Sequence, residues 1–181
     1  MTTEKIDKLA IEVSEELEKE TNANLIALST GVVLRTKPVS NIVFTEFQKK
    51  HPQPKVPVWF NKENDRNESN PNDPTYIEAM RNWQFEVGLG IVDLLIILGT
   101  TFESATGNAP KLNDEEWVDD LEFAGIEFDR SNRRARYLAY VKYVAAPEDE
   151  DMEKLMSRVS GQSGVAEADV KTAEDQFRDK K

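Results

Sequence analysis

The sequence predicts an α+β fold that is predominantly helical, with a small N-terminal β-hairpin or three-stranded sheet packed with a long central helix and a C-terminal helical bundle. Three observations lead to this prediction. Apolar side chains recur at helical spacing through residues 74–99, two short β-rich runs flank a turn within residues 24–36, and amphipathic helical patterns return after residue 114. With 181 residues, the chain is expected to form one domain.

Residues 74–99 are predicted to form the helix around which the other elements pack. Asp73 suits the N-cap position, Pro74 suits the first turn, where no amide donor is needed, and Gly99 suits the end of the helix. Besides a main apolar stripe, a second apolar row covers the opposite side from mid-helix onward: Phe85, Leu89, Val92 and Ile96. A helix that is apolar on every side must be buried, in its own fold or against a partner.

Asp93 is the one charged residue in the apolar second half of this helix. We expect its carboxylate to be buried and paired with an arginine, for which the following region offers Arg133, Arg134 and Arg136. The functional alternative is that Asp93 is a polar group that fixes the register of an interface.

The chain before the central helix is predicted to hold a surface helix over residues 3–19, the hairpin, and a second helix over 41–50. Residues 55–60 are expected to be extended and to dock on the hairpin as an edge strand, because the proline among them lacks an amide donor. Residues 61–73 are expected to form an exposed polar loop.

The chain after the central helix is predicted to be a connector over residues 100–113 followed by helices. These are expected over 114–124, from Ser131, from Pro147 to the glycine-containing break at 161–164, and in a last amphipathic segment. The expected organisation is a single domain, 1–181, with the following parts: N-terminal helix and small sheet 1–60, polar loop 61–73, central helix 74–99 and C-terminal helices 114–178.

Composition excludes several classes of partner and site. The net charge of −11 argues against nucleic acid and against anionic membrane surfaces as partners. With no cysteine, the chain has no disulfide, thiol nucleophile or cysteine-based zinc site. The charged N-terminus lacks the apolar core of a signal peptide, and the longest apolar run, 88–98, is far short of the ~20 residues of a spanning helix, so no transmembrane segment is expected.

The sequence offers no catalytic constellation. Its one histidine, His51, lies between lysine and proline in a helix-ending segment, and neither a nucleophile elbow nor a glycine-rich phosphate loop is present. Residues 65–76 begin like a calcium loop, but its sixth position is Asn70 and its twelfth is Tyr76, where glycine and glutamate are needed. The carboxylates of 115–122 are expected to be solubilising rather than an acid–base pair. We therefore predict a protein that is not an enzyme, with no catalytic residue, metal or cofactor.

The sequence favours association with other proteins as the function. A long apolar helix in an otherwise polar chain leaves room for an exposed binding surface. We expect six residues of the central helix to form it, partly as core and partly facing a partner: Trp83, Val87, Ile91, Leu94, Leu95 and Leu98.

Four segments carry a resemblance to a known family: residues 31–39 (GVVLRTKPV), 52–57 (PQPKVP), 70–76 (NPNDPTY) running into the central helix, and 163–170 (SGVAEADV) leading to Phe177. In their order they resemble small proteins encoded in the tail modules of long-tailed bacteriophages, many of which are tail assembly chaperones. The resemblance covers most of the chain from residue 31 onward.

The resemblance implies a non-enzymatic viral protein in the cytoplasm of the bacterial host. Such a chaperone coats the apolar helices of the tape-measure protein until tail-tube subunits replace it, and it often exists in a short and a frameshifted long form. The ending at Lys180 and Lys181 fits a slippery lysine pair, although a frayed charged tail is the simpler interpretation. The alternative function is a structural virion protein, a connector or tail component that stays in the particle. A homo-oligomer is compatible with both, and a small enzyme or a regulatory adaptor is the third hypothesis.

Overall fold

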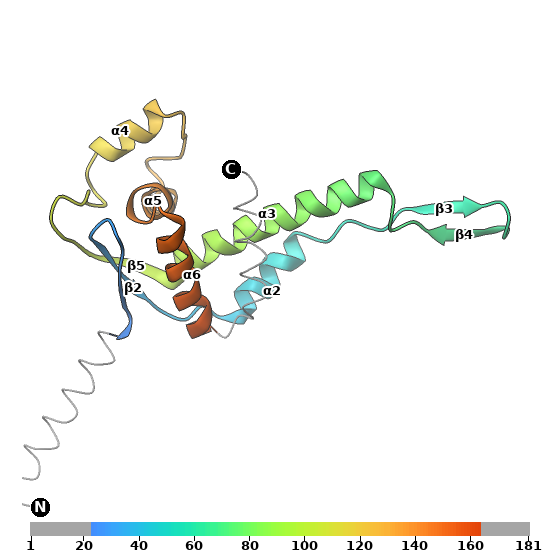
Figure 1. Ribbon diagram of the computed structural model, residues 1–181, viewed down its shortest axis with the longest axis horizontal. Helices are drawn as coiled ribbons and strands as arrows, with labels where there is room; N and C mark the ends of the chain where they lie inside the picture. Colours follow the sequence, from blue (N-terminus) through green and yellow to red (C-terminus); the bar gives the residue numbers. More distant parts are fainter. Residues whose placement is uncertain (1–22, 164–181) are drawn as a thin grey trace, which may run out of the picture.

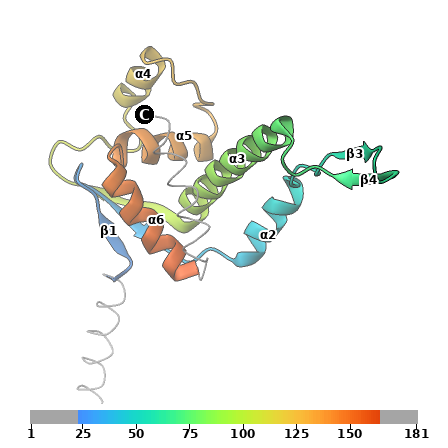
Figure 2. The same ribbon diagram turned by 45° about the vertical axis from the view of Figure 1, so that its right-hand side comes forward.

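The computed structural model describes residues 23–163. The described chain forms a body, made of a small sheet and the C-terminal helices, from which a long arm projects (Figure 1). The arm consists of a helix pair and ends in a separate two-stranded hairpin, and it keeps its projecting position when the molecule is turned (Figure 2). The mixed, mainly helical class predicted from the sequence is confirmed. The predicted helices over 3–19 and beyond residue 164 lie outside the described residues.

Helix α3 (Pro74–Gly99) has the predicted bounds. It begins where the Asp73 carboxylate accepts hydrogen bonds from the amides of Thr75, at 2.9 Å, and Tyr76, at 3.2 Å. These bonds, and first of all the one from the Thr75 hydroxyl, hold the pKa of Asp73 below its usual value. The helix ends at Gly99, after which Thr100 is extended. A Cβ on Gly99 would lie 2.2 Å from Val159 Cγ1, so this glycine permits close packing rather than a left-handed turn.

The sheet of the body has the order β1-β2-β5 and is antiparallel. The predicted hairpin is present as β1 (Leu25–Ala27) and β2 (Val32–Thr36). The third strand is β5 (Thr100–Ala105), which follows α3 directly, and not the segment 55–60. Residues 100–113 were predicted to be a connector because they hold glycine and proline. The first six nevertheless form a strand, because the end of α3 lies beside the end of β2, where the Lys37 amide donates to the Gly99 carbonyl at 2.9 Å.

The predicted polar loop 61–73 is also corrected by the structure. Strand β3 (Val58–Asn61) pairs with β4 (Arg66–Ser69) in a hairpin of its own, at the far end of the arm. The Glu68 carboxylate accepts hydrogen bonds from Asn61, Asn64 and Arg66, which lower its pKa, the Asn61 bond most. Polar side chains hold this hairpin, so the alternation of apolar residues that normally reveals a strand is missing.

The C-terminal helices are α4 (Glu116–Phe123), α5 (Arg133–Tyr140), the π-helical turn η1 (Val141–Ala145) and α6 (Asp149–Ser163). The N-cap of α5 is Asn132 instead of the predicted start at Ser131, because the Asn132 side chain accepts from two amides of the first turn. Helix α6 continues through Gly161 to Ser163, where a break was predicted. In the interior of a helix a single glycine weakens the helix without ending it.

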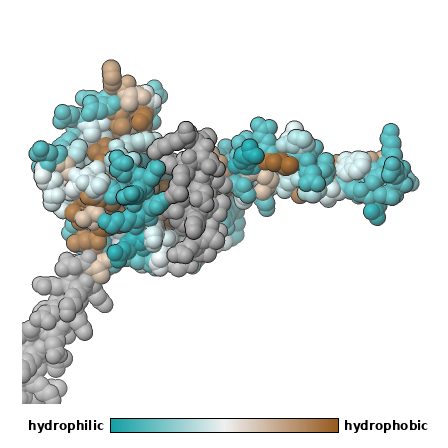
Figure 3. All heavy atoms as spheres, in the orientation of Figure 1, coloured by the Kyte–Doolittle hydropathy of each residue, from teal (hydrophilic) through white to brown (hydrophobic). Residues whose placement is uncertain are grey.

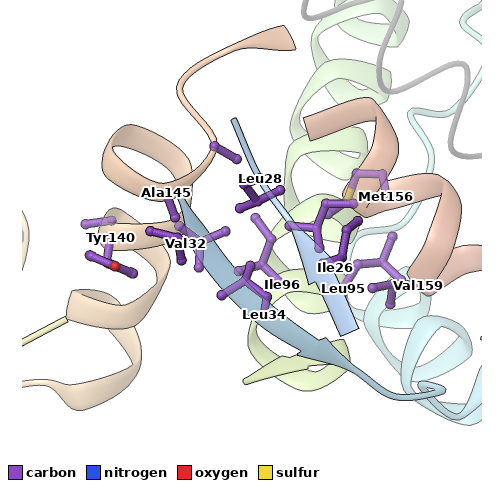
Figure 4. Close-up of a cluster of buried hydrophobic side chains, with 14 of the residues drawn as sticks. Ile26, Leu28, Val32, Leu34, Leu95, Ile96, Tyr140, Ala145, Met156 and Val159 are labelled. Carbon is purple, nitrogen blue, oxygen red and sulfur yellow. The ribbon is translucent and has the colours of Figure 1, made fainter. Parts of the chain in front are cut away.

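The core lies between the sheet, α3 and α6 (Figure 4). Alternate residues of β2 point inward, and they meet the C-terminal half of α3 and one face of α6. The fully buried apolar side chains of this centre are Val32, Leu34, Leu95, Ile96, Leu155, Met156 and Val159. Helix α6 is fastened to the hairpin turn by buried Asp151, whose carboxylate accepts from the Ser29 amide and, at 2.5 Å, from the Ser29 hydroxyl.

Candidate partner-binding surface

Helix α3 is more apolar than its burial requires. By length and composition it could cross a membrane: an 18-residue window reaches a mean hydropathy of 1.3, and 33% of that window is buried in the structure. The sequence prediction counted only the run 88–98, which Asp93 interrupts, and so found no such helix. The core helix of a soluble protein passes the same test, but it is mostly buried. The other residues of the apolar half, 87–99, are half-buried and none is exposed, so the described part of the chain covers this half of α3 only in part.

The six residues predicted to form the partner-binding surface lie on the side of α3 that faces the body and α2. Val87, Ile91 and Leu95 are core residues, with exposed fractions of 7%, 6% and 0%. Trp83, Leu94 and Leu98 are half-buried and pack against that core. The structure places none of the six among the exposed residues, and the stripe chosen from the sequence is chiefly the packing face.

A different row of α3 lies beside the core residues, on the side where Asp93 meets Lys142 of η1. Leu89 and Ile97 are half-buried, and neither belongs to the residues that pack on the hydrophobic core of the described chain. They lie one helical turn before and after Asp93, so the three side chains share one face of the helix. We call Leu89, Asp93 and Ile97 the outer stripe. The signal for it was present in the second apolar row noted in the sequence, which contains Leu89.

Asp93 is paired with a lysine and not with an arginine. Lys142 Nζ lies 2.5 Å from Asp93 Oδ1, in an ion-pair contact that lacks the angles of a hydrogen bond. Lys142 belongs to η1. Arg136, one of the three arginines expected to pair with Asp93, instead places its Nη1 2.8 Å from a Glu115 carboxylate oxygen and its guanidinium over the Trp117 ring. A π-helical turn shifts side chains around the helix axis, so helical periodicity did not point to Lys142.

The helical part of the arm is formed by α2 (Asn41–Lys50), which lies along α3. A Cβ on Gly90 would lie 2.2 Å from Phe47 Cζ, so the glycine lets the Phe47 ring approach the α3 backbone. Trp83 Nε1 donates to the His51 carbonyl at 2.9 Å, and the His51 ring lies tilted against the Phe47 ring with 4.2 Å between their centroids. His51 thus ends α2 and joins it to α3, which is a structural role.

The tip of the arm exposes three consecutive apolar side chains. Val58, Trp59 and Phe60 of β3 are 63%, 51% and 52% exposed. Sequence reasoning did not select them, because a short apolar run after a proline was taken for an edge strand on the body sheet. Figure 3 shows hydrophobic side chains interspersed with hydrophilic ones on the arm, and further hydrophobic ones on the body near α4.

The described residues offer little for bond-making chemistry. Within residues 23–163, no group of three or more histidine or acidic side chains is placed to hold a metal ion. Three of the six carboxylates in residues 114–122 are in ion pairs: Arg130 contacts Asp119 and Glu122, and Arg136 contacts Glu115.

Comparisons with known proteins identified no similar protein. No protein-family model, no curated protein and no solved structure matches this chain.

Proposed function

We propose that this chain is a non-enzymatic protein that binds partner proteins during phage tail assembly. On this proposal, the outer stripe of α3 holds an apolar helix of the tape-measure protein until tail-tube subunits replace it in the host cytoplasm. The observation that carries the proposal is helix α3, which is long and apolar enough to span a membrane and whose Leu89 and Ile97 are half-buried without belonging to the residues packed on the core. A second helix laid along Leu89 and Ile97 would complete that burial, in the manner of an amphipathic helix in a groove.

A protein helix fits this surface better than a lipid bilayer does. The C-terminal half of α3 contacts β5, α5 and α6, so a spanning orientation would require the core to come apart. Asp93 and Lys142 form an ion pair in the middle of the outer stripe, where a bilayer would have to accommodate both charges. The net charge of −11 also opposes approach to anionic lipid.

The second candidate function is a structural protein that stays in the virion, as a connector or tail component. The arm favours it, because an ordered extension with exposed Val58, Trp59 and Phe60 is suited to a permanent contact between subunits. The two functions differ in the fate of the protein after assembly.

Quantitative mass spectrometry of purified particles beside lysate of producing cells separates the two. Abundance in lysate with absence from particles supports the chaperone. A fixed copy number in particles would overturn it in favour of the structural protein.

The surface itself is tested with the double variant Leu89→Asp and Ile97→Asp. We expect loss of at least tenfold in affinity for a tape-measure helix, measured by titration calorimetry, with the circular dichroism of the wild type. The control is Ile42→Asp, which changes a side chain that is 71% exposed on α2 and should bind as the wild type does. Unchanged binding by the double variant, or sedimentation of the wild type with neutral lipid vesicles, would exclude the proposed surface.

A further inference from the structure

The outer stripe of α3 is an apolar row that the described core does not use. Leu89 and Ile97 are half-buried and stand outside the residues that pack on that core. They are eight positions apart, which corresponds to about 12 Å along a helix. A segment with one apolar face of about that length is enough to cover both side chains.

The described chain ends beside the C-terminal end of α3. The Val39 amide donates to the Ser163 hydroxyl oxygen at 2.8 Å, and this hydroxyl donates to the Val159 carbonyl at 2.6 Å. Val159 packs where α3 ends, since a Cβ on Gly99 would lie 2.2 Å from its Cγ1. The chain beyond Ser163 therefore starts near the Ile97 end of the outer stripe.

Residues 164–181 match the stripe in length and in pattern. As a helix, these eighteen residues would span about 27 Å, so the 12 Å between Leu89 and Ile97 leaves several residues for the link from Ser163. The segment has five acidic and four basic side chains, so its docking on an acidic chain meets little repulsion. Its apolar residues recur at spacings of four, three and four, which predicts one narrow apolar helix face: Ala166, Val170, Ala173 and Phe177.

The segment 1–22 joins the described chain on a different side of α6. Arg158 Nη1 donates to the Ala23 carbonyl at 3.1 Å, and the Gln162 side-chain amide donates to the side-chain oxygen of Asn24 at 2.9 Å. Arg158 and Gln162 are one helical turn apart, so the face of α6 that they share is not the face that meets Gly99. The chain thus enters on the hairpin side of α6 and leaves on the α3 side, which gives residues 164–181 the shorter route to the stripe.

We infer that residues 164–181 run antiparallel along α3 and cover the outer stripe in the free chain. The direction follows from the starting point, because a segment that begins at the end of α3 covers Ile97 and Leu89 only by running back toward Pro74. On the proposed function, on which this consequence rests, a partner helix must first displace the segment. A tethered competitor lowers the apparent affinity for the partner until it is released.

Spin-label distances in the full chain test this placement, because the sequence has no cysteine and label sites can be introduced in pairs. One pair is Asn82→Cys with Asp179→Cys, and the other is Asn82→Cys with Glu167→Cys; Asn82 is exposed in the first half of α3. We expect a narrow distance distribution for each pair. The second mean should be longer by about 10 Å, because twelve helical residues rise about 18 Å. Broad distributions for both pairs, or the reverse order of the means, would overturn the placement.

A released variant and a matched control identify the face that docks. Val170→Asp with Phe177→Asp puts two charges on the predicted apolar face and should broaden both distributions. Ala168→Asp with Thr172→Asp puts the same charges on the opposite face and should leave them narrow. Distances unchanged in the first variant, or broadened equally in both, would exclude docking through this face.

Titration calorimetry then separates this contact from the proposed function. The released variant should bind a tape-measure helix at least tenfold more tightly than the wild type does, and equal affinity would exclude competition for the stripe. If neither chain binds the helix, the proposed function fails, whereas the placement of residues 164–181 is still decided by the spin-label distances.

Discussion

Replacement of Asp151 by alanine tests how the two ends of the described chain are joined. Asp151 is 6% exposed and lies in the first turn of α6, and its carboxylate oxygens are 3.1 and 3.0 Å from the amide nitrogen of Ser29 and 2.5 Å from its hydroxyl. This contact bridges 122 positions of sequence and closes the body around the hairpin turn. The same turn is tied to η1, because the Thr30 hydroxyl donates to the Ala145 carbonyl at 2.7 Å.

The magnitude follows from the number of bonds and their surroundings. A hydrogen bond to a charged group contributes about 1.5–3 kcal/mol, and Asp151 accepts from two donor groups of Ser29. Ser29 itself is exposed, so water satisfies its amide and hydroxyl after the substitution and offsets part of the loss. We expect Asp151→Ala to lower the free energy of unfolding by about 2–3 kcal/mol, which for a chain of this size lowers Tm by roughly 4–12 °C.

Urea unfolding followed by circular dichroism measures the effect, with Glu150→Ala as the matched control. Glu150 is exposed in the same helical turn, so its removal changes the net charge and the helix-dipole interaction equally and breaks no bond to the hairpin. A difference of less than about 0.5 kcal/mol between the two variants would refute the role assigned to Asp151, since that is the scatter of ordinary surface substitutions.

Three further predictions concern packing, pH and the ion pair of α3. Gly99→Ala should lower the free energy of unfolding by about 1–3 kcal/mol, because its Cβ would meet Val159 Cγ1 at 2.2 Å. Gly161→Ala, with open space around it, should raise the free energy of unfolding by up to about 1 kcal/mol. Stabilisation by both variants in urea titrations would contradict the close contact at Gly99. Desolvation raises the pKa of Tyr140 to about 12, so the stability that its neutral form contributes is complete below pH 10, the value for an unfolded chain, and is lost as the pH rises toward 12. Unfolding free energies between pH 8 and 11 should therefore fall less steeply for Tyr140→Phe, although this variant also loses the bond to the Pro110 carbonyl; equal slopes would exclude the raised pKa. Lys142→Met should lower the free energy of unfolding by up to about 1 kcal/mol, and by less in high salt, because the ion pair with Asp93 is partly exposed. Arg134→Met should leave the free energy of unfolding unchanged. The reverse order in the same urea titrations would indicate an arginine as the partner of Asp93.

The features that could be predicted from sequence are those with a local cause. The start of α3 was predictable because Asp73 and Pro74 satisfy the first turn with atoms that are neighbours in the chain, and the first hairpin because its glycine-containing turn separates two β-rich runs. The core side of α3 followed from periodicity alone, since Val87, Ile91 and Leu95 lie on one stripe. The same periodicity cannot distinguish a stripe that packs internally from one that binds a partner, so a partner-facing role for the six predicted residues stays a prediction.

The sequence by itself therefore determined the class of the fold, the bounds of its main helix and the acidic character of the chain. Only the tertiary structure decided that residues 100–105 form the third strand, that Asp93 pairs with Lys142, and that residues 58–69 form the tip of a projecting arm. Each of these depends on which distant segments lie side by side. A strand exists only beside its neighbour, and an ion pair only where two backbones bring the charges together, so neither leaves a periodic trace in the sequence.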